Sequence, residues 1–198
     1  AAANCPDLVF LGLGTGLGAG LVLGGRLHRG PSGGAGEIGH LLTGVPDGPR
    51  CSCGRTGCLQ SVASGSAVLA RAGRARGRPV GPGAFRAGLA AGEPWARAAF
   101  EEAVAALAPA VVNLGELLEC ARVVIGGGFG SGVPGLVAAV ARRAARYARP
   151  GREPPAVSRA VHGPEASLYG AMLLARGPGR GVSPTALTSG RTRWTNAS

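Results

Sequence analysis

Three cysteines and a histidine form the group of residues with the clearest chemistry in this sequence. Cys51, Cys53 and Cys58 fall within eight residues, and His40 precedes them by eleven positions. Three thiolates and one imidazole make a closed tetrahedral donor set, which suits structural zinc and leaves no open position for a catalytic ion. The alternative is a loop of three reduced cysteines beside an unrelated histidine.

The spacing within this cluster is tight, because Cys51 and Cys53 are separated by a single residue. Gly54 and Gly57 relieve this constraint, since glycine adopts the positive φ angles needed to wrap a small ion. Three thiolates on a dication leave a charge of about −1. Arg50 and Arg55 flank the thiols and are placed to offset that charge.

Two glycine-rich segments are candidate nucleotide-binding loops. Gly14, Thr15 and Gly16 join two apolar runs, and backbone N–H groups in such a turn can hold a phosphate. Gly126, Gly127 and Gly128 follow the apolar run RVVI, where glycine lets a nucleotide approach the backbone. Each segment taken alone is equally well explained as a tight turn, and neither is a Walker A loop.

Strand and helix patterns alternate along the chain and predict an α/β domain whose ligands lie beyond the strand tips. We expect strands over 8–30, an irregular segment over 31–58, and a helix from Leu59 that gives way to a loop over 73–83. A helix from Pro94 should kink or break at Pro109. The later elements expected are a strand over 122–128 that ends in three glycines, a helix over 132–148, a short strand over 156–163 and a helix over 165–176.

The last residues, 177–198, have little apolar content and no period, so we expect a disordered tail after a domain over 1–176. No apolar run approaches the roughly 20 residues of a membrane span, and no secretory signal is evident at the start. With an odd number of cysteines, five, this predicts a cytoplasmic protein without disulfides.

The net charge is +11, and all basic residues are arginine. A basic chain can indicate nucleic-acid binding. These arginines are scattered without aromatic interleaving, and Ala, Gly, Arg and Pro are all abundant, as a GC-rich genome would give. We therefore expect no nucleic-acid contact by this segment and no membrane contact. His28 and His162 lack neighbouring ligand residues and are expected to be surface or hydrogen-bonded histidines.

The motifs together resemble those of the ROK family of sugar kinases and repressors (repressor, open reading frame, kinase). The run LGLGTGLGAGLVLGGRLHRGPSGGAGEIGH is followed by CSCGRTGCLQSVASG, and RVVIGGGF and GPEASLYGAMLLA match the later part of the family pattern. The combination of Gly-Glu-Ile-Gly-His with Cys-x-Cys-Gly-x-x-Gly-Cys is highly specific. The resemblance covers about residues 7–176.

The resemblance implies an actin-like ATPase (ribonuclease-H-like) domain, the C-terminal half of a two-domain sugar kinase fold, and a homodimer. It implies that His40, Cys51, Cys53 and Cys58 bind zinc and that Glu37 and His40 bind sugar hydroxyls. A zinc ion held by one imidazole nitrogen would fix the orientation of the ring. Gly14, Thr15 and Gly16 match the second phosphate loop of the family, and Gly126, Gly127 and Gly128 match its adenosine loop.

Three departures from the family pattern qualify these expectations. Gln60 stands where the family usually has a sugar-contacting Glu, so the position keeps an acceptor and loses a charge. The Asp-x-Gly-x-Thr phosphate loop and the Asn-Asp pair that supplies the catalytic base do not occur, and Cys5-Pro6-Asp7 does not fit that pair. We therefore identify no catalytic residue in this chain and expect it to be a partial protein.

Three functions follow from this pattern. The first is glucokinase-like phosphorylation of a hexose or N-acetylated hexose, with ATP and Mg²⁺. The second is a sugar-sensing transcriptional repressor, in which a DNA-binding element precedes the sugar domain. The third is an inactive remnant that binds zinc but no sugar.

Overall fold

A computed structural model describes residues 5–44 and 48–175 of the chain. The chain forms two units, Ala1–Ala166 and Ser167–Ser198, each described here by itself. The first unit contains the sheet, the cysteine cluster and both glycine-rich segments. The tail expected over 177–198 lies outside the described residues.

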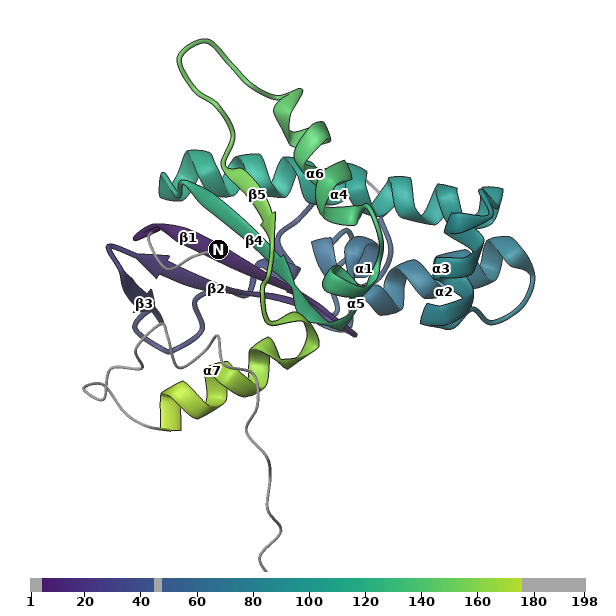
Figure 1. Cartoon of the computed structure of the whole chain (residues 1–198), viewed down its shortest axis with the longest axis horizontal. Helices are drawn as coiled ribbons and strands as arrows, with labels where there is room; N and C mark the ends of the chain where they lie inside the picture. Colours follow the sequence, from purple (N-terminus) through teal and green to yellow (C-terminus); the bar gives the residue numbers. More distant parts are fainter. Residues whose placement is uncertain (1–4, 45–47, 176–198) are drawn as a thin grey trace, which may run out of the picture. The chain divides into compact units, whose positions relative to one another are not determined.

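A mixed five-stranded sheet forms the centre of the first unit (Figure 1). Its spatial order is β3-β2-β1-β4-β5, with β1, β2 and β3 antiparallel and β1, β4 and β5 parallel. The strands are β1 (Leu8–Leu13), β2 (Leu17–Leu23), β3 (Arg26–His28), β4 (Arg122–Gly126) and β5 (Ala156–Arg159). The strands expected over 8–30 are confirmed.

The two faces of β1 differ because side chains alternate along a strand. Val9, Leu11 and Leu13 are fully buried and belong to the main apolar core. Phe10 lies on the other face, where its ring covers Gly126 of β4. In the parallel register of these strands, Phe10 is paired with Val124, two residues before Gly126.

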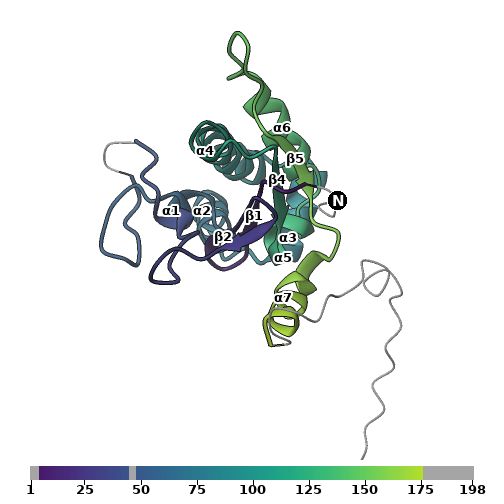
Figure 2. The same ribbon diagram turned by 90° about the vertical axis from the view of Figure 1, so that its left-hand side faces the viewer.

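Helices pack on the sheet around one long central helix, α4 (Pro94–Leu118) (Figure 2). It contacts α1, α2, α3 and α6, and Leu107 and Val111 on its inner face are fully buried. The other elements are η1 (Ile38–His40), α1 (Leu59–Ala63), α2 (Gly65–Arg76), α3 (Pro82–Ala90), α5 (Gly127–Gly132), α6 (Leu136–Ala145) and η2 (Gly163–Glu165). In the second unit, α7 runs from Ala166 to Ala175.

The helix α4 is long and apolar enough to meet the length and composition criteria for a membrane span. Half of its most apolar window is buried inside the protein, so its apolar character is explained by its place in the core. The helix also continues through Pro109, so the break expected there is wrong. Packing against other helices on both sides of Pro109 outweighs the one backbone hydrogen bond that proline removes.

The loop expected over 73–83 is confirmed only over 77–81, because both of its ends are helical. The helix α2 continues to Arg76 and ends at Gly77, whose φ of 74° gives a left-handed cap. A further helix, α3, then begins with Pro82 in its first turn, where the missing N–H costs nothing. The glycines after β4 begin α5 rather than an open loop, and the helix expected over 132–148 is the shorter α6.

The parallel pairing of β1 and β4 brings the two glycine-rich segments to one edge of the sheet. Gly14–Gly16 follows the carboxyl end of β1, and Gly127–Gly128 follows the carboxyl end of β4. Ligands of open α/β sheets bind at this edge. The cysteine cluster is next to it, because η1 contacts both β2 and α1.

Candidate functional site

The structure brings His40, Cys51, Cys53 and Cys58 together. One donor atom from each residue lies within 4.8 Å of all the others. The Sγ of Cys51 is 3.7 Å from Nδ1 of His40, and the sulfurs of Cys53 and Cys58 are 3.6 Å apart. All five cysteines are free thiols.

Backbone hydrogen bonds hold the cysteine loop in this shape. The N–H of Cys51 donates to the carbonyl of Arg55, and the N–H of Gly54 donates to the carbonyl of Cys51. The N–H of Leu59, at the start of α1, donates to the carbonyl of Leu41 and ties the loop to the end of η1. The donor atoms therefore converge through backbone geometry before any ion is added.

The donor set fits a tetrahedral zinc ion. Sulfur atoms about 2.3 Å from zinc lie about 3.8 Å apart at the corners of a tetrahedron, and a nitrogen ligand shortens that edge slightly. The separations of 3.6 and 3.7 Å are close to this value. The other donor separations are at most 4.8 Å, so a binding ion would draw the four atoms together by no more than about 1 Å.

The thiols of the cluster differ in acidity. The backbone N–H of Cys53 and the amide of Gln60 lower the pKa of Cys51 to about 6. The backbone and guanidinium of Arg55 lower the pKa of Cys53, as expected of an arginine beside the cluster. Burial raises the pKa of Cys58 to about 11. At neutral pH the metal-free cluster thus contains both thiolate and thiol.

The two ring nitrogens of His40 face different groups. Its Nδ1 faces Cys51, whose thiol raises the pKa of the imidazole, while its Nε2 lies 3.8 Å from Oε2 of Glu37. The turn that carries both residues packs directly on β2. A Cβ at Gly39 would lie 2.1 Å from the carbonyl oxygen of Leu17, so only glycine allows this approach.

The side chain of Gln60 lies between the cysteine cluster and the Gly14–Gly16 turn. Its Nε2 donates to Sγ of Cys51 at 3.2 Å. Its Oε1 points the other way and is 3.5 Å from where a Cβ of Gly16 would lie. The three residues expected to bind sugar, Glu37, His40 and Gln60, are therefore grouped around one thiol and the end of β1.

The Gly14–Gly16 turn is fastened to the start of α2. The N–H of Gly65 donates to the carbonyl of Gly14, and the hydroxyl of Ser66 donates to the carbonyl of Thr15 at 2.5 Å. A cavity of about 360 Å³ opens on this turn. Its lining consists of Gly14, Thr15, Gly65, Ser66, Leu69, Pro82, Arg86, Gly128, Phe129, Gly132 and Val133.

The second glycine-rich segment reaches this cavity through Gly128 alone. Gly126 is buried beneath Phe10, and Gly127 packs on the backbone of Leu13. Sequence reasoning missed Ser66, which lies on α2, and Arg86, which lies on α3, a helix that the sequence analysis did not predict. Ser66 had a signal, because the Ser-Gly-Ser run contains the N-cap of α2.

Asp7 is the one acidic residue before β1 in the sequence. Its hydrogen bond lies away from the cysteine cluster. Its carboxylate accepts a hydrogen bond from the N–H of Gly24, in the turn between β2 and β3. That turn is at the opposite end of β2 from Leu17 and the phosphate-loop edge. The expectation that Cys5-Pro6-Asp7 does not supply a catalytic base stays a prediction.

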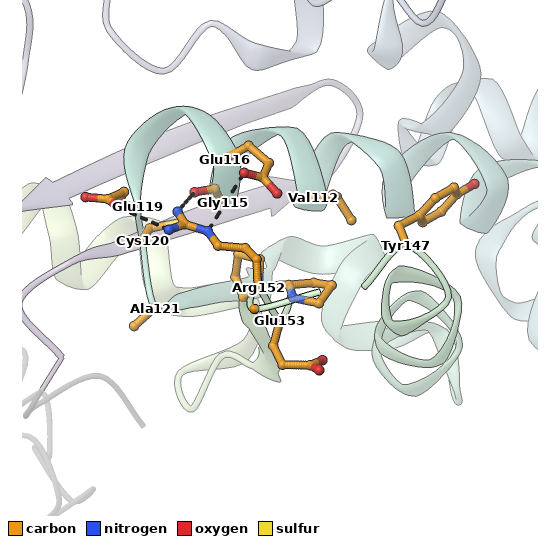
Figure 3. Close-up of a pocket in the computed structure, with 12 residues that line it drawn as sticks. Val112, Gly115, Glu116, Glu119, Cys120, Ala121, Tyr147, Arg152 and Glu153 are labelled. Atoms are coloured by element: carbon orange, nitrogen blue, oxygen red, sulfur yellow. Dashed lines mark hydrogen bonds and ion pairs between the residues drawn. The ribbon is translucent and has the colours of Figure 1, made fainter. Parts of the chain in front are cut away.

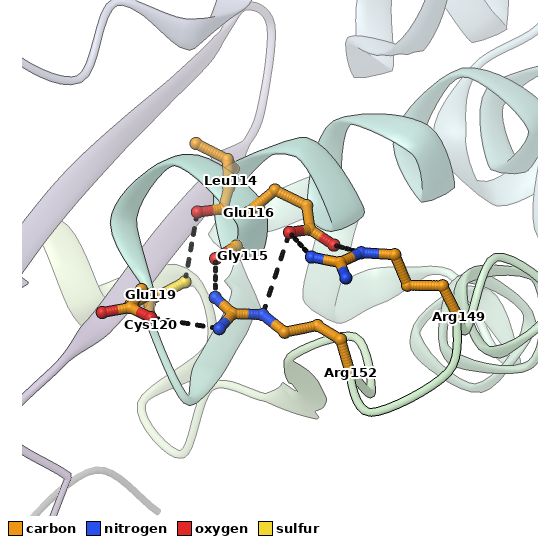
Figure 4. A network of polar contacts seen from close by, with 7 residues as sticks. All are labelled: Leu114, Gly115, Glu116, Glu119, Cys120, Arg149 and Arg152. Carbon is orange, nitrogen blue, oxygen red and sulfur yellow. Dashed lines mark hydrogen bonds and ion pairs between the residues drawn. The ribbon is translucent and has the colours of Figure 1, made fainter.

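A larger cavity, of about 420 Å³, lies where β4 and β5 begin (Figure 3). Among its lining residues, Arg152 bonds Glu119 and the carbonyl of Gly115, and Glu116 makes a bidentate pair with Arg149, which lies outside the lining (Figure 4). These contacts neutralise one another and complete the last turn of α4. The cavity is at the amino ends of the parallel strands, away from the edge where such sheets bind ligands.

Comparison with known proteins identifies the family. A family model described as "ROK family" matches residues 1–177. Kanosamine kinase of Amycolatopsis mediterranei is 45% identical over 88% of this chain and 57% of its own length. A ROK hexokinase from Thermus thermophilus superposes with a TM-score of 0.79 at 36% identity, covering 89% of this chain and 60% of that one.

A ROK glucokinase from Streptomyces griseus, solved with glucose and AMPPNP, superposes with a TM-score of 0.81 at 29% identity. This match covers 89% of the chain and 62% of the glucokinase. The chain belongs to the ROK family and has the actin-like ATPase fold of its sugar kinases. It spans less than two thirds of the length of the relatives it matches.

Proposed function

We propose that this ROK-family chain is the sugar- and zinc-binding part of an ATP-dependent kinase that phosphorylates a hexose or an N-acetylated hexose. The observation that carries the proposal is the grouping of Glu37, His40 and Gln60 between a closed Cys₃His donor set and the Gly14–Gly16 turn. Kanosamine kinase and ROK glucokinase, which share the fold, are named for sugar phosphorylation.

Zinc, when bound to His40, Cys51, Cys53 and Cys58, supplies a fixed orientation for the imidazole and closes the loop. In this proposal His40 keeps Nδ1 on the metal side, so that Nε2 and the carboxylate of Glu37 face the sugar hydroxyls. An exposed carboxylate and an imidazole N–H offer the acceptor and donor that vicinal hydroxyls require.

The nucleotide is proposed to occupy the cavity on the Gly14–Gly16 turn. Thr15 is exposed there, and the start of α2 places the partial positive charge of a helix N-terminus beside the same space. Arg86, the one charged residue in the cavity lining, is placed to attract phosphate. ATP and Mg²⁺ belong to this proposal, as does an assembly of two copies.

We assign phosphoryl transfer to the whole protein and expect no turnover from these 198 residues alone, since no catalytic base is identified among them. A repressor or an inactive remnant remains an alternative prediction. A DNA-binding element upstream in the gene would favour the repressor, and loss of sugar binding with zinc retained would favour the remnant.

Three measurements test the proposal. Elemental analysis of the reduced, purified chain should give one zinc per chain, and calorimetry should detect binding of glucose, N-acetylmannosamine or kanosamine. A coupled assay for ADP release with the same sugars should then show turnover by the full-length gene product. The absence of turnover with all three sugars would overturn the kinase assignment.

A further inference from the structure

Gln60 contacts both parts of the site through different atoms of one amide. On the nitrogen side, Nε2 donates to Sγ of Cys51 at 3.2 Å and lies 3.4 Å from Oγ of Ser52. On the oxygen side, Oε1 is 3.2 Å from the position a Cβ of Gly39 would take and 3.5 Å from that of Gly16. The amide therefore spans the distance from the thiol cluster to the phosphate loop.

The orientation of this amide follows from its chemistry. A thiolate accepts hydrogen bonds and donates none, so the side chain presents its nitrogen to Cys51 and its oxygen to the opposite side. A carboxylate at the same position has no hydrogen to donate and would place a second negative charge beside the sulfur. The bond to Cys51 is therefore available to glutamine and not to glutamate.

We propose that Gln60 is a positioning residue with two separable tasks: its amide N–H holds the Cys51 thiolate of the metal cluster, and its Oε1 is thereby fixed as a neutral acceptor for a sugar hydroxyl. This inference rests on the proposed zinc and sugar sites. It explains how the chain works with glutamine where its family usually has glutamate. Glutamine lacks the negative charge of glutamate, but its amide couples the sugar acceptor to a ligand of the metal.

Two substitutions separate the tasks. Gln60→Glu keeps the acceptor but removes the donor to Cys51. Gln60→Met keeps a side chain of similar length but removes both donor and acceptor. Asn113→Asp is the matched control, because it makes the same amide-to-acid change on an exposed residue of α4 that is not part of the cluster.

The first assay is the release of zinc from the zinc-loaded chain to an excess of chromophoric chelator. We expect Gln60→Glu to release zinc about 10- to 100-fold faster than wild type, the effect of losing a hydrogen bond to a metal ligand. Gln60→Met should show a smaller acceleration, because it removes the bond without adding a charge. Asn113→Asp should match wild type.

The second assay is calorimetric titration with glucose, N-acetylmannosamine and kanosamine. In this assay Gln60→Met should be the more affected variant, whereas Gln60→Glu is the more affected one in the zinc-release assay. The sugar affinity of Gln60→Met should fall below that of Gln60→Glu, since only the latter keeps an oxygen acceptor. A purely structural defect would rank the two variants in the same order in both assays. Circular dichroism establishes whether each variant is folded. If Gln60→Glu fails to fold, the zinc release and the sugar affinity of Gln60→Met test both tasks.

Zinc release from folded Gln60→Glu at the wild-type rate would overturn the first task, and unchanged sugar affinity in Gln60→Met would overturn the second. Failure of the proposed function has a different signature. In that case wild type itself would contain no zinc or bind none of the sugars.

Discussion

Removal of zinc should weaken the fold without abolishing it. The main core is built from the sheet and helices and does not depend on the cysteine loop: Leu11, Leu107 and Ile125 are fully buried in it. The cysteine loop is also held by backbone bonds, and two of the donor separations, 3.6 and 3.7 Å, are close to tetrahedral spacing. Metal binding should therefore act as a ligand that stabilises an already folded domain.

The magnitude follows from mass action. With free zinc at about a thousand times its dissociation constant, binding contributes about 4 kcal/mol to the free energy of unfolding. In a domain of this size, each kcal/mol shifts the melting temperature by about 2–4 °C. Adding a strong chelator to the reduced chain should thus lower the melting temperature by about 8–16 °C.

The assay is thermal unfolding followed by circular dichroism, with and without chelator. In Cys53→Ser the chelator shift should disappear, and because Cys53 is the exposed thiol of the cluster its loss costs little packing. Cys5→Ser, which changes a thiol outside the cluster, should keep the full shift. A melting temperature that chelator leaves unchanged in wild type would refute the reasoning.

Three further predictions rest on other contacts. Because Arg149 lowers the pKa of Glu116, that carboxylate stabilises the fold above its unfolded pKa near 4.5 and loses this effect as pH falls through the lower folded value. Glu116→Gln should therefore lower the melting temperature at pH 7, and its difference from wild type should shrink as the pH is lowered below 4.5. Because Cys58, with a pKa of about 11, must lose a proton when zinc binds, chelator competition should show apparent zinc affinity falling at least about tenfold per unit from pH 8 to 6. Gly127→Ala, with a φ of 80° and a Cβ 2.4 Å from the carbonyl oxygen of Leu13, should lower the free energy of unfolding in urea by about 1–3 kcal/mol, whereas Gly128→Ala, whose Cβ meets nothing within 4 Å, should change it by less than about 1 kcal/mol.

The elements predicted correctly are those whose signals are local. The cysteine cluster, the strands from Leu8 and the helix start at Pro94 each depend on residues close together in the chain. The errors arose where context outweighed a local signal. Pro109 lies in a helix that packs along its length, and Pro82, read as part of a loop, opens α3 because proline is favoured in the first turn.

The arrangement of the candidate site was beyond sequence reasoning for a different reason. Gln60 could be recognised as a departure from the family pattern, but its bond to Cys51 depends on where α1 begins relative to the cysteine loop. In the same way, Arg86 joins the cavity lining because α3 returns toward the Gly14–Gly16 turn. No spacing in the sequence encodes these long-range approaches.

A continuous series of short bonds links the metal cluster to the phosphate loop. The carbonyl of Gln60 accepts from the N–H of Ser64, which caps α2, and the next residues, Gly65 and Ser66, bind the carbonyls of the Gly14–Gly16 turn. Two of these bonds join backbone groups and the third comes from the hydroxyl of Ser66, so displacement of α1 would be transmitted to the turn. Loss of metal from the cysteine loop, which is fastened to the start of α1, should therefore disturb phosphate binding as well as sugar binding. On this argument, zinc would fix the position of α1, and through it the positions of both substrates of the proposed kinase.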